Sequence, residues 1–374
     1  MIEKNTIHIV CPEAPWPLTS GSRIDMFYRL RYLHEAGITI FLHYFSMSEG
    51  SRHPTELNPY CKAIYVYPLE KNGARQWPDR IRLRSHPALL ARLQIDQHPI
   101  ILEGLSCCGH LHALWSPQRK ILVRIQQLQH RYLQEKGTQT KNPVLWLRWY
   151  IERKKLLLFK RQLPAQVWYA CTNEGQANYY REKLGLPHTK VLPVFSPYHK
   201  VLSKEGLGSF CLFQGDLSEK ETEKILVWLL TKVFSRVSIP FVIAGQHPSP
   251  RIEKLVHLYQ HTCLVANPGE TEMDDLIQKA QTHVLPSSVS AGTSIRLLHA
   301  LSQGRHCICN TNALKDTPLK EACYSADSAA GIASLITELH HRPFGEEEVA
   351  LRRRLLQETF DTTKITAAII RYLG

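Results

Sequence analysis

The chain has 374 residues, which is enough for two domains of ordinary size, each with its own core. Its hydrophobic fraction of 44% is that of a globular protein, and no run approaches the roughly 20 apolar residues that a membrane-spanning helix needs. The formal net charge of +13 lies entirely in residues 1–195, so we expect only this half to face an anionic partner.

The start of the chain and its cysteines indicate a cytoplasmic protein. Residues 1–10 read as a charged stub followed by a short strand, which is not the pattern of a signal peptide. Ten cysteines are spread thinly, and neither close pair, Cys107-Cys108 or Cys307-x-Cys309, has the spacing of a zinc site. We expect buried free thiols in a reducing compartment.

Short apolar strands alternate with amphipathic helices along the first half. A helix is expected over residues 22–36, ended by Gly37. The expected strands are residues 7–10, 38–45, 63–67, 100–103, 121–125 and 167–171. This alternation is typical of a parallel sheet with crossover helices.

The alternation is interrupted near Pro193 and Pro197 and then restarts. We place a linker there, because a polar stretch containing Gly206 and Gly208 follows the two prolines. The expected strands of the second half are residues 210–214, 241–244, 262–266, 283–286 and 306–310. Two Rossmann-like α/β domains result, with a cleft between them, and such sheets bind ligands outside the carboxyl ends of their strands.

The first strand leads into a loop that contains Ser20 and Gly21. Small residues let the backbone approach a ligand, and the N-terminus of the following helix attracts anions. A purely structural interpretation is also open, in which Ser20 or Ser22 caps the helix.

A second loop, residues 213–220, follows the first strand of the second half. Gly215 ends the strand and Lys220 could reach a phosphate, whereas Asp216 would repel one. Ser218 followed by Glu221 is also a capping box, which would explain much of this pattern without any ligand.

A third loop, residues 285–301, is rich in hydroxyls and leads into a helix with Arg296 near its start. Hydroxyls, backbone N–H groups and an arginine together can hold a diphosphate. An arginine in the first turn opposes the helix dipole, so an anion nearby would account for it.

The order of these pieces resembles the retaining glycosyltransferases of family four, which have the GT-B fold of two Rossmann-like domains facing each other across a cleft. The resemblance rests on the Pro-x-Pro-x-x-Ser-Gly-x-Arg-Ile loop at 15–24, the strand at 241–245, the segment at 272–280, the strand at 284–287, and Gly292 with the helix that follows it. It implies an acceptor-binding domain at 1–195, a nucleotide-sugar domain at 196–355, and a final segment at 356–374 whose helix, 362–373, returns to the first domain.

The resemblance also implies roles for individual residues. Arg296 and Lys220 match the basic positions at the donor diphosphate, residues 267–273 border the base, and His299 lies near the ribose. The complete set expected at the donor is Ser20, Gly21, Gly215, Lys220, Met273, Ser287, Ser288, Gly292, Thr293, Arg296 and His299. Arg23 and Arg124 are expected to contact the acceptor or a phosphate.

The chain departs from the family pattern at several positions. Ala291 and His299 stand where many relatives have glutamates, and Asp216 stands where many have arginine. Gln126 replaces a family histidine and cannot transfer a proton, although the leaving diphosphate can itself accept the acceptor's proton. Glu103 could orient an acceptor hydroxyl or could cap the next turn. We take Glu103 and Gln126 as the candidate catalytic residues.

A basic and aromatic segment indicates a membrane surface. Residues 119–161 contain 12 Lys/Arg and two acids. Within them, aromatic and basic side chains mix as they do in an interfacial helix, with Trp146, Trp149, Arg153, Lys154 and Lys155 as the expected contacts. Alternatively, the aromatic side chains face the core of an ordinary amphipathic helix.

These patterns favour a glycosyltransferase that acts at the inner membrane face on a lipid-linked or polysaccharide acceptor in cell-surface glycan synthesis. A sugar-nucleotide epimerase shares the fold, and a degenerate scaffold that only binds donor or membrane would explain the missing glutamates. No nucleic-acid motif accompanies the basic segment. The chain has no Asp-x-Asp, so we expect neither a metal nor another cofactor.

Overall fold

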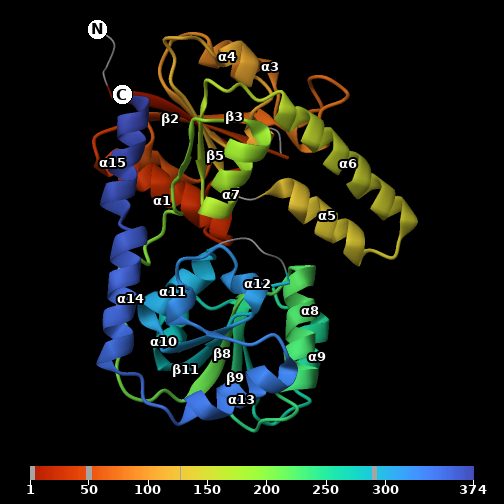
Figure 1. Cartoon of the computed structure of the whole chain (residues 1–374), viewed down its shortest axis with the longest axis vertical. Helices are drawn as coiled ribbons and strands as arrows, with labels where there is room; N and C mark the ends of the chain where they lie inside the picture. The colour runs from red at the N-terminus through yellow and green to blue at the C-terminus, as the bar shows by residue number, and fades with distance from the viewer. Residues whose placement is uncertain (1–4, 48–52, 127, 289–292) are drawn as a thin grey trace. The chain divides into compact units, whose positions relative to one another are not determined.

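The computed structural model describes residues 5–47, 53–126, 128–288 and 293–374. The chain forms two compact units, each built on a parallel sheet with helices around it (Figure 1). The first unit comprises Met1–Leu18, Ser22–Phe195 and Thr362–Gly374. The second comprises Thr19–Gly21 and Ser196–Asp361, so it ends six residues later than the expected limit at 355.

The first unit contains a seven-stranded sheet in the order β3-β2-β1-β4-β5-β6-β7, all parallel. Its strands are β1 Thr6–Cys11, β2 Thr39–Ser46, β3 Ala63–Pro68, β4 Ile100–Glu103, β5 Ile121–Ile125, β6 Trp168–Cys171 and β7 Thr189–Val191. The helices are α1 Gly21–Glu35, α2 Asp79–Arg82, α3 Pro87–Leu93, α4 Leu111–Leu114, α5 Gln129–Gln139, α6 Pro143–Arg161, α7 Glu174–Asn178 and α15 Thr362–Leu373.

The second unit contains a six-stranded parallel sheet in the order β10-β9-β8-β11-β12-β13. Its strands are β8 Phe210–Asp216, β9 Phe241–Gln246, β10 Thr262–Ala266, β11 Ala280–Val284, β12 His306–Cys309 and β13 Tyr324–Ser325. The helices are α8 Lys220–Trp228, α9 Pro250–Val256, α10 Glu270–Lys279, α11 Ile295–Gln303, α12 Thr311–Leu314, α13 Ala329–His340 and α14 Glu346–Thr359. Short 3-10 or π turns lie at Thr55–Tyr60, Leu105–Cys107, Tyr179–Lys183, Leu229–Val233 and Lys320–Ala322.

Apolar cores cover both faces of the first sheet, because successive residues of a strand point to opposite faces. On β4, Ile101 belongs to the core that also contains Ile365 and Ile369 of α15, whereas Leu102 belongs to the core on the other face. The last helix of the chain therefore packs on the first unit through its apolar side. All ten cysteines are free thiols, and only Cys263 is exposed.

Most of the expected strands are present, but β11 is displaced and β7 and β13 were not predicted. The expected strand at 283–286 begins three residues earlier, at Ala280. Gln281 is buried in this strand and its amide donates to the carbonyls of Leu339 and Arg342, each at 2.7 Å. Buried polar side chains of this kind hide a strand from a search for apolar runs.

Candidate functional site

Most of the expected donor residues lie at the carboxyl ends of β8 and β11, in the loops that follow them or at the start of the next helix. β8 and β11 are parallel neighbours in one sheet, so their carboxyl ends meet at one edge. Helices α8 and α11 begin at Lys220 and Ile295, directly after these two loops. Within the second unit, the sequence-predicted residues of the second and third loops are therefore brought to the same edge.

Arg296 lies against Gly215 at this edge. Its Nη1 donates to the carbonyl of Gln214 at 3.2 Å, and its guanidinium lies 5.9 Å from the ring centroid of Phe213. A Cβ atom added at Gly215 would lie only 2.8 Å from the same Nη1. Glycine at this position therefore leaves the space that the guanidinium occupies. Burial lowers the pKa of Arg296, and the carboxylate of Glu219 opposes this shift.

Lys220 is exposed at the first residue of α8, but the capping box expected there is not formed. The Ser218 hydroxyl instead donates to Asp216 Oδ1 at 2.6 Å, and the Ser218 N–H donates to the same oxygen at 3.0 Å. Because Asp216 takes both donors, the helix begins one residue later, after Glu219. Glu221, the expected partner of Ser218, accepts a hydrogen bond from Ser288 Oγ at 3.3 Å.

The hydroxyl-rich loop that follows β11 is held by hydrogen bonds at its first serine, Ser287. The Ser287 N–H donates to Asn310 Oδ1 at 2.9 Å, and Asn310 Nδ2 donates back to the Ser287 carbonyl at 2.8 Å. Farther along, Thr293 and Thr317 hydroxyl oxygens lie 2.9 Å apart. Gly292 lies outside the described residues, so its expected place at the diphosphate stays a prediction.

His299 is buried on α11 and already has two partners within the second unit. Its Nε2 lies 2.8 Å from Asp274 Oδ1, and its ring stacks on Tyr198 with centroids 3.9 Å apart and planes 10° apart. The hydrogen bond from His299 lowers the pKa of Asp274. A carboxylate is thus present beside the position where relatives have a glutamate, but it comes from α10.

The segment expected to border the base, residues 267–273, follows β10 and leads into α10, and it is hydrogen-bonded to residues at the end of β9. Asn267 adopts a left-handed backbone conformation with φ of 53°, and its Oδ1 accepts the N–H of His247 at 2.7 Å. Gln246 Nε2 donates to the Pro268 carbonyl at 3.0 Å. Met273 is half-buried on α10 and packs against the small core that contains Leu212 and Ala244.

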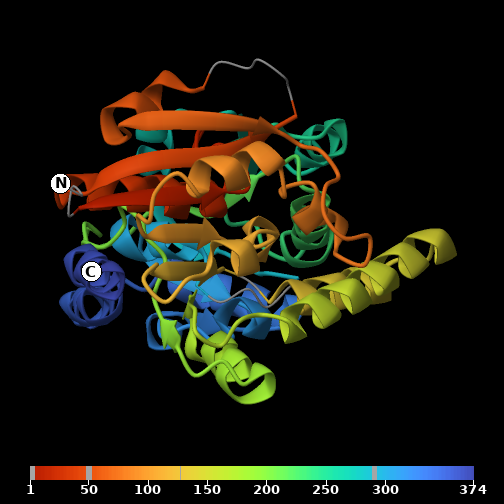
Figure 2. The same cartoon turned by 90° about the horizontal axis from the view of Figure 1, so that it is seen from above.

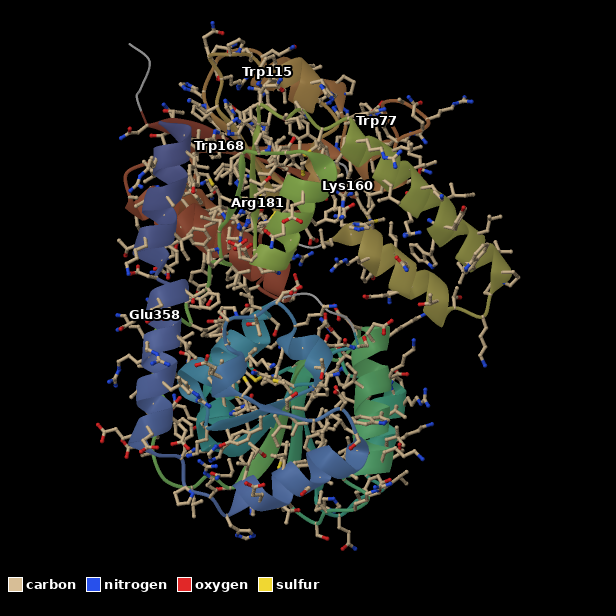
Figure 3. The ribbon with its side chains drawn as sticks, viewed as in Figure 1. Trp77, Trp115, Lys160, Trp168, Arg181 and Glu358 are labelled. Carbon is tan, nitrogen blue, oxygen red and sulfur yellow. The ribbon has the colours of Figure 1, made fainter. Side chains whose placement is uncertain are left out.

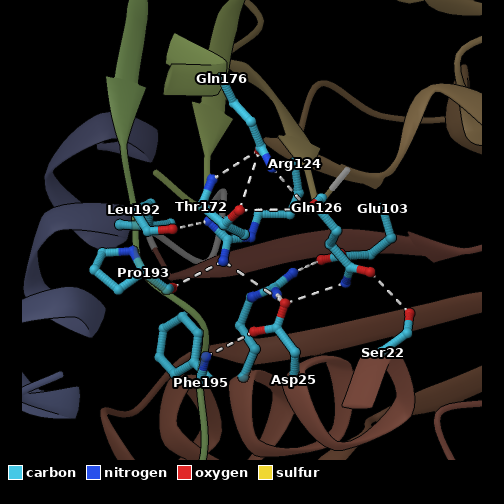
Figure 4. A network of polar contacts seen from close by, with 11 residues as sticks. Ser22, Asp25, Glu103, Arg124, Gln126, Thr172, Gln176, Leu192, Pro193 and Phe195 are labelled. Carbon is cyan, nitrogen blue, oxygen red and sulfur yellow. Dashed lines mark hydrogen bonds and ion pairs between the residues drawn. The ribbon is translucent and has the colours of Figure 1, made fainter. Parts of the chain in front are cut away.

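The first unit holds a polar cluster at the carboxyl ends of β4 and β5, shown in Figure 4. Its members are Ser22, Asp25, Arg29, Glu103, Arg124 and Gln126. Asp25 pairs with Arg29 at 2.7 Å, and its other oxygen accepts the Phe195 N–H at 2.7 Å. Burial would raise the pKa of Asp25, but the two arginines outweigh it and hold the pKa below its usual value.

Arg124 lies in the core of this cluster and does not have the geometry expected for an acceptor or phosphate contact. Its side chain is fully buried, and its guanidinium donates to the carbonyls of Leu192 and Pro193, the latter at 2.8 Å. Burial lowers its pKa to about 10, which the charge of Asp25 opposes. Arg124 therefore fixes the segment that leaves β7. Arg23, the other expected contact, is partly exposed and pairs with Glu13 at 2.6 Å.

The two candidate catalytic residues are both members of the cluster. Glu103 is 2% exposed and forms an ion pair with Arg29. Gln126 is half-buried, where its Oε1 accepts from Ser22 Oγ at 2.8 Å and its Nε2 donates to Asp25 Oδ2 at 3.1 Å. In this conformation Glu103 is engaged by Arg29, and Gln126 is engaged by Ser22 and Asp25. Ser20 directly precedes α1, which begins at Gly21.

Comparison with known proteins connects this geometry to a chemistry. Residues 209–341, which include every expected donor residue of the second unit from Gly215 to His299, match the family of glycosyl transferases group 1. This part of the chain is therefore a group 1 glycosyltransferase domain. No curated protein matches it in a sequence comparison.

Solved structures show that the chain has the GT-B fold. Sucrose-phosphate synthase from Thermosynechococcus elongatus has 14% identity and a TM-score of 0.73 over 98% of both chains. WaaG, a glycosyltransferase involved in lipopolysaccharide biosynthesis, has 11% identity and a TM-score of 0.64 over 98% of this chain and 99% of its own. Anabaena HepE, in a complex with UDP and glucose, has 9% identity and a TM-score of 0.64 over 98% of both chains.

Sequence reasoning missed several partners of the expected site residues. These are Asp25, Arg29, Tyr198, Asp274 and Asn310. The spacing of Asp25 and Arg29, four residues apart in a predicted helix, is a signal for an ion pair on one helix face. The others come together only through the folding of separate segments.

The expected membrane residues differ in exposure. Trp146 is 48% exposed, whereas Trp149 is half-buried and packs against the core of the first unit. Lys154 is exposed, while Lys155 lies 3.5 Å from Glu152. The described helices include none that is long and apolar enough to span a membrane. Within the described ranges, no three His, Cys, Asp or Glu side chains gather as metal ligands.

Proposed function

We propose that the chain transfers a sugar, with retention, from a nucleotide-diphosphate sugar to a lipid-linked or polysaccharide acceptor in cell-surface glycan synthesis. The observation that carries this proposal is the match of residues 209–341 to group 1 glycosyltransferases, because it encloses the edge where Lys220 and Arg296 lie. The complex of HepE with UDP and glucose supports a nucleotide-sugar donor.

In the proposed reaction, the second unit binds the donor. A nucleotide diphosphate that leaves the sugar gains negative charge, and prepositioned cations and backbone N–H groups stabilise that charge without reorganising. Lys220 and Arg296 are the cations at the relevant loops, and each lies in the first turn of its helix, where the N–H groups point toward an anion. The leaving diphosphate then accepts the proton of the acceptor hydroxyl, so no basic side chain is needed.

In this proposal the first unit binds the acceptor at the cytoplasmic face of the membrane. The support is its charge, since residues 1–195 carry the whole net charge of +13. Anionic lipid attracts basic segments at about 1 kcal/mol for each Lys or Arg near the surface. A lipid-linked or growing glycan acceptor would meet the enzyme there.

A screen of UDP-, GDP-, ADP- and dTDP-sugars by thermal shift tests the donor half of the proposal. A ligand at 100 times its dissociation constant stabilises the folded chain by about 2.7 kcal/mol, so the right donor class raises the melting temperature clearly. Incubation of that donor with and without candidate acceptors then separates transfer from epimerisation, because an epimerase needs no acceptor. A chain that no nucleotide sugar stabilises would contradict the proposal.

A further inference from the structure

Helices α5 and α6 form a hairpin that is anchored to the first unit at one end only. At the base of the hairpin, Leu156, Phe159 and Lys160 are buried, and the rings of Phe159 and Trp77 meet edge to face with centroids 5.6 Å apart. Figure 3 labels Trp77 and Lys160 at this base. The start of α6 lies at the opposite end. In Figures 1 and 2, α6 runs outward from the body of the first unit. The hairpin is thus a projection with a packed base and an uncovered end.

The uncovered end is apolar. Residues 141–148 are all exposed. Val144 is 73% exposed, and Leu147 is 50% exposed. The large hydrophobic side chains exposed here, which we call the hairpin tip, are Val144, Leu145, Trp146, Leu147, Tyr150 and Ile151. Apolar side chains clustered in this way mark a surface that another body covers.

We propose that the hairpin tip inserts into the headgroup interface of an anionic lipid bilayer and holds the enzyme at the membrane surface. This deepens the proposed membrane placement, on which it rests, by assigning the contact to one element. The proposal is supported by the combination of an apolar tip with basic residues on either side of it. Residues 129–161 carry nine Lys/Arg and only two acids. An anionic bilayer complements both features, because its interior takes the apolar side chains and its headgroups take the cations.

The same charge argues against a second copy of this chain as the occupant. Two hairpins packed tip to tip would bring two equally basic surfaces together, and like charges repel. The aromatic side chains also suit a bilayer edge. Trp146 and Tyr150 stack with centroids 5.5 Å apart, and Lys154 Nζ lies 5.4 Å from the Tyr150 ring centroid. Aromatic rings and long basic side chains are enriched at this depth of a membrane.

The backbone N–H groups at the start of α6 have hydrogen-bond partners within the chain, as an apolar medium requires. A helix start normally leaves its first N–H groups without partners, and an unsatisfied N–H group is strongly unfavourable in lipid, where no water can accept its hydrogen bond. Here the side chain of Asn142 accepts the N–H groups of Val144 and Leu145 at 2.9 and 3.2 Å. The Asn142 carbonyl accepts the Trp146 N–H at 2.9 Å, and Pro143 has no N–H to satisfy. The first turn therefore enters lipid without an uncompensated donor.

Vesicle sedimentation of the full chain tests the inference. The vesicles contain phosphatidylcholine and phosphatidylglycerol in equal parts, with pure phosphatidylcholine as the uncharged comparison. The double variant Val144→Asp/Leu147→Asp places two charges on exposed positions, so the fold is retained. We expect it to lower partitioning onto the anionic vesicles by at least about tenfold. Leu258→Asp is the matched control, because Leu258 is 71% exposed in the second unit, and we expect it to bind as wild type does.

Insertion is then separated from surface attachment by brominated lipids. We expect these lipids to quench wild-type tryptophan fluorescence, and the Trp146→Phe variant to lose that quenching. Equal partitioning of wild type and the double variant would overturn the inference, as would binding without quenching. A wild-type oligomer that the double variant converts to monomers, without vesicle binding, would assign the tip to a second copy. Binding to an acidic protein but not to vesicles would assign it to that partner.

The failure of this inference is distinct from failure of the proposed transferase function. A chain that binds a nucleotide sugar in the thermal-shift screen but ignores the vesicles keeps its donor site and loses only the hairpin assignment. A chain that partitions through the hairpin tip but binds no nucleotide sugar keeps the hairpin assignment and loses the donor site.

Discussion

The two units differ in how the charged side chains near the carboxyl ends of their strands are paired and buried. In the first unit, Asp25, Arg29, Glu103 and Arg124 are buried and paired with one another, so their charges compensate internally. In the second unit, Lys220 is exposed and Arg296 faces a carbonyl. Equivalent places in two similar sheets thus hold a structural ion cluster in one unit and cations suited to an anionic ligand in the other.

The comparison predicts its largest effect at Arg29. The Arg29→Met variant leaves the buried carboxylate of Glu103 without its arginine partner and leaves Asp25 with Arg124 alone, and breaking a buried pair costs about 3–5 kcal/mol. Arg31→Met on the same helix is the control, because the Arg31–Glu35 pair at 2.8 Å is more than 40% exposed on both sides and contributes at most about 1 kcal/mol. Chemical denaturation measures both, and equal losses would show that the cluster is not structural.

In the second unit, we expect replacement of Arg296 to lower the affinity for the donor, in contrast to the loss of stability expected at Arg29. Replacement of Arg296 by Ala removes a charge-assisted contact to the donor diphosphate worth roughly 1.5–3 kcal/mol, or about tenfold or more in affinity. Arg251→Ala is the control, because Arg251 is exposed on α9 in the same unit. Titration calorimetry with the donor found in the screen gives both affinities. Unchanged binding by a folded Arg296→Ala variant would remove Arg296 from the donor site.

Lys160 sharpens the comparison, because it is a buried cation of the first unit that contacts a histidine instead of a carboxylate. Its Nζ lies 2.9 Å from His130 Nδ1, and burial lowers its pKa from 10.5 to about 7. Below pH 7, both folded and unfolded chains bind the proton, and the folded chain bears its full burial cost. Between pH 7 and 10.5 the unfolded chain alone binds it, so stability rises with pH.

This rise should have a slope of up to about 1.4 kcal/mol for each pH unit. Lys160→Met removes the titrating group and should flatten that part of the profile, whereas Lys154→Met, at an exposed position of the same helix, should leave it unchanged. Denaturation at several pH values between 7 and 10 measures the slopes. Parallel profiles for wild type and Lys160→Met would contradict the lowered pKa.

The smallest expected effect is that of chelation. The chain has no Asp-x-Asp, Asp274 is bound to His299, and Asp275 pairs with Lys279 at 2.6 Å. We therefore predict that Lys220 and Arg296 meet the diphosphate charge without a metal, and that excess EDTA leaves the initial rate of transfer unchanged. Complete loss of activity that magnesium or manganese restores would show that a metal shares this task.

The sequence predicts the fold further than it predicts the site. The alternation of apolar strands with amphipathic helices predicted nearly all of the strands, and the expected loops do follow β8 and β11. The partners of the site residues follow from long-range folding that no local pattern encodes, such as Asp274 beside His299 or the Leu192 carbonyl on Arg124. Local competition also misled the prediction, since Asp216 takes the Ser218 hydroxyl that the capping box required.

Hydrogen exchange in the presence of the donor tests the central claim most directly. The probe is the nucleotide sugar that gives the largest thermal shift. We predict that it slows exchange in residues 214–221 and 293–299, where the loop ends carry Lys220 and Arg296, and that the Arg296→Ala variant loses this protection at the same donor concentration. Protection confined to the first unit, with none in these two segments, would contradict the assignment of the donor site to the second unit.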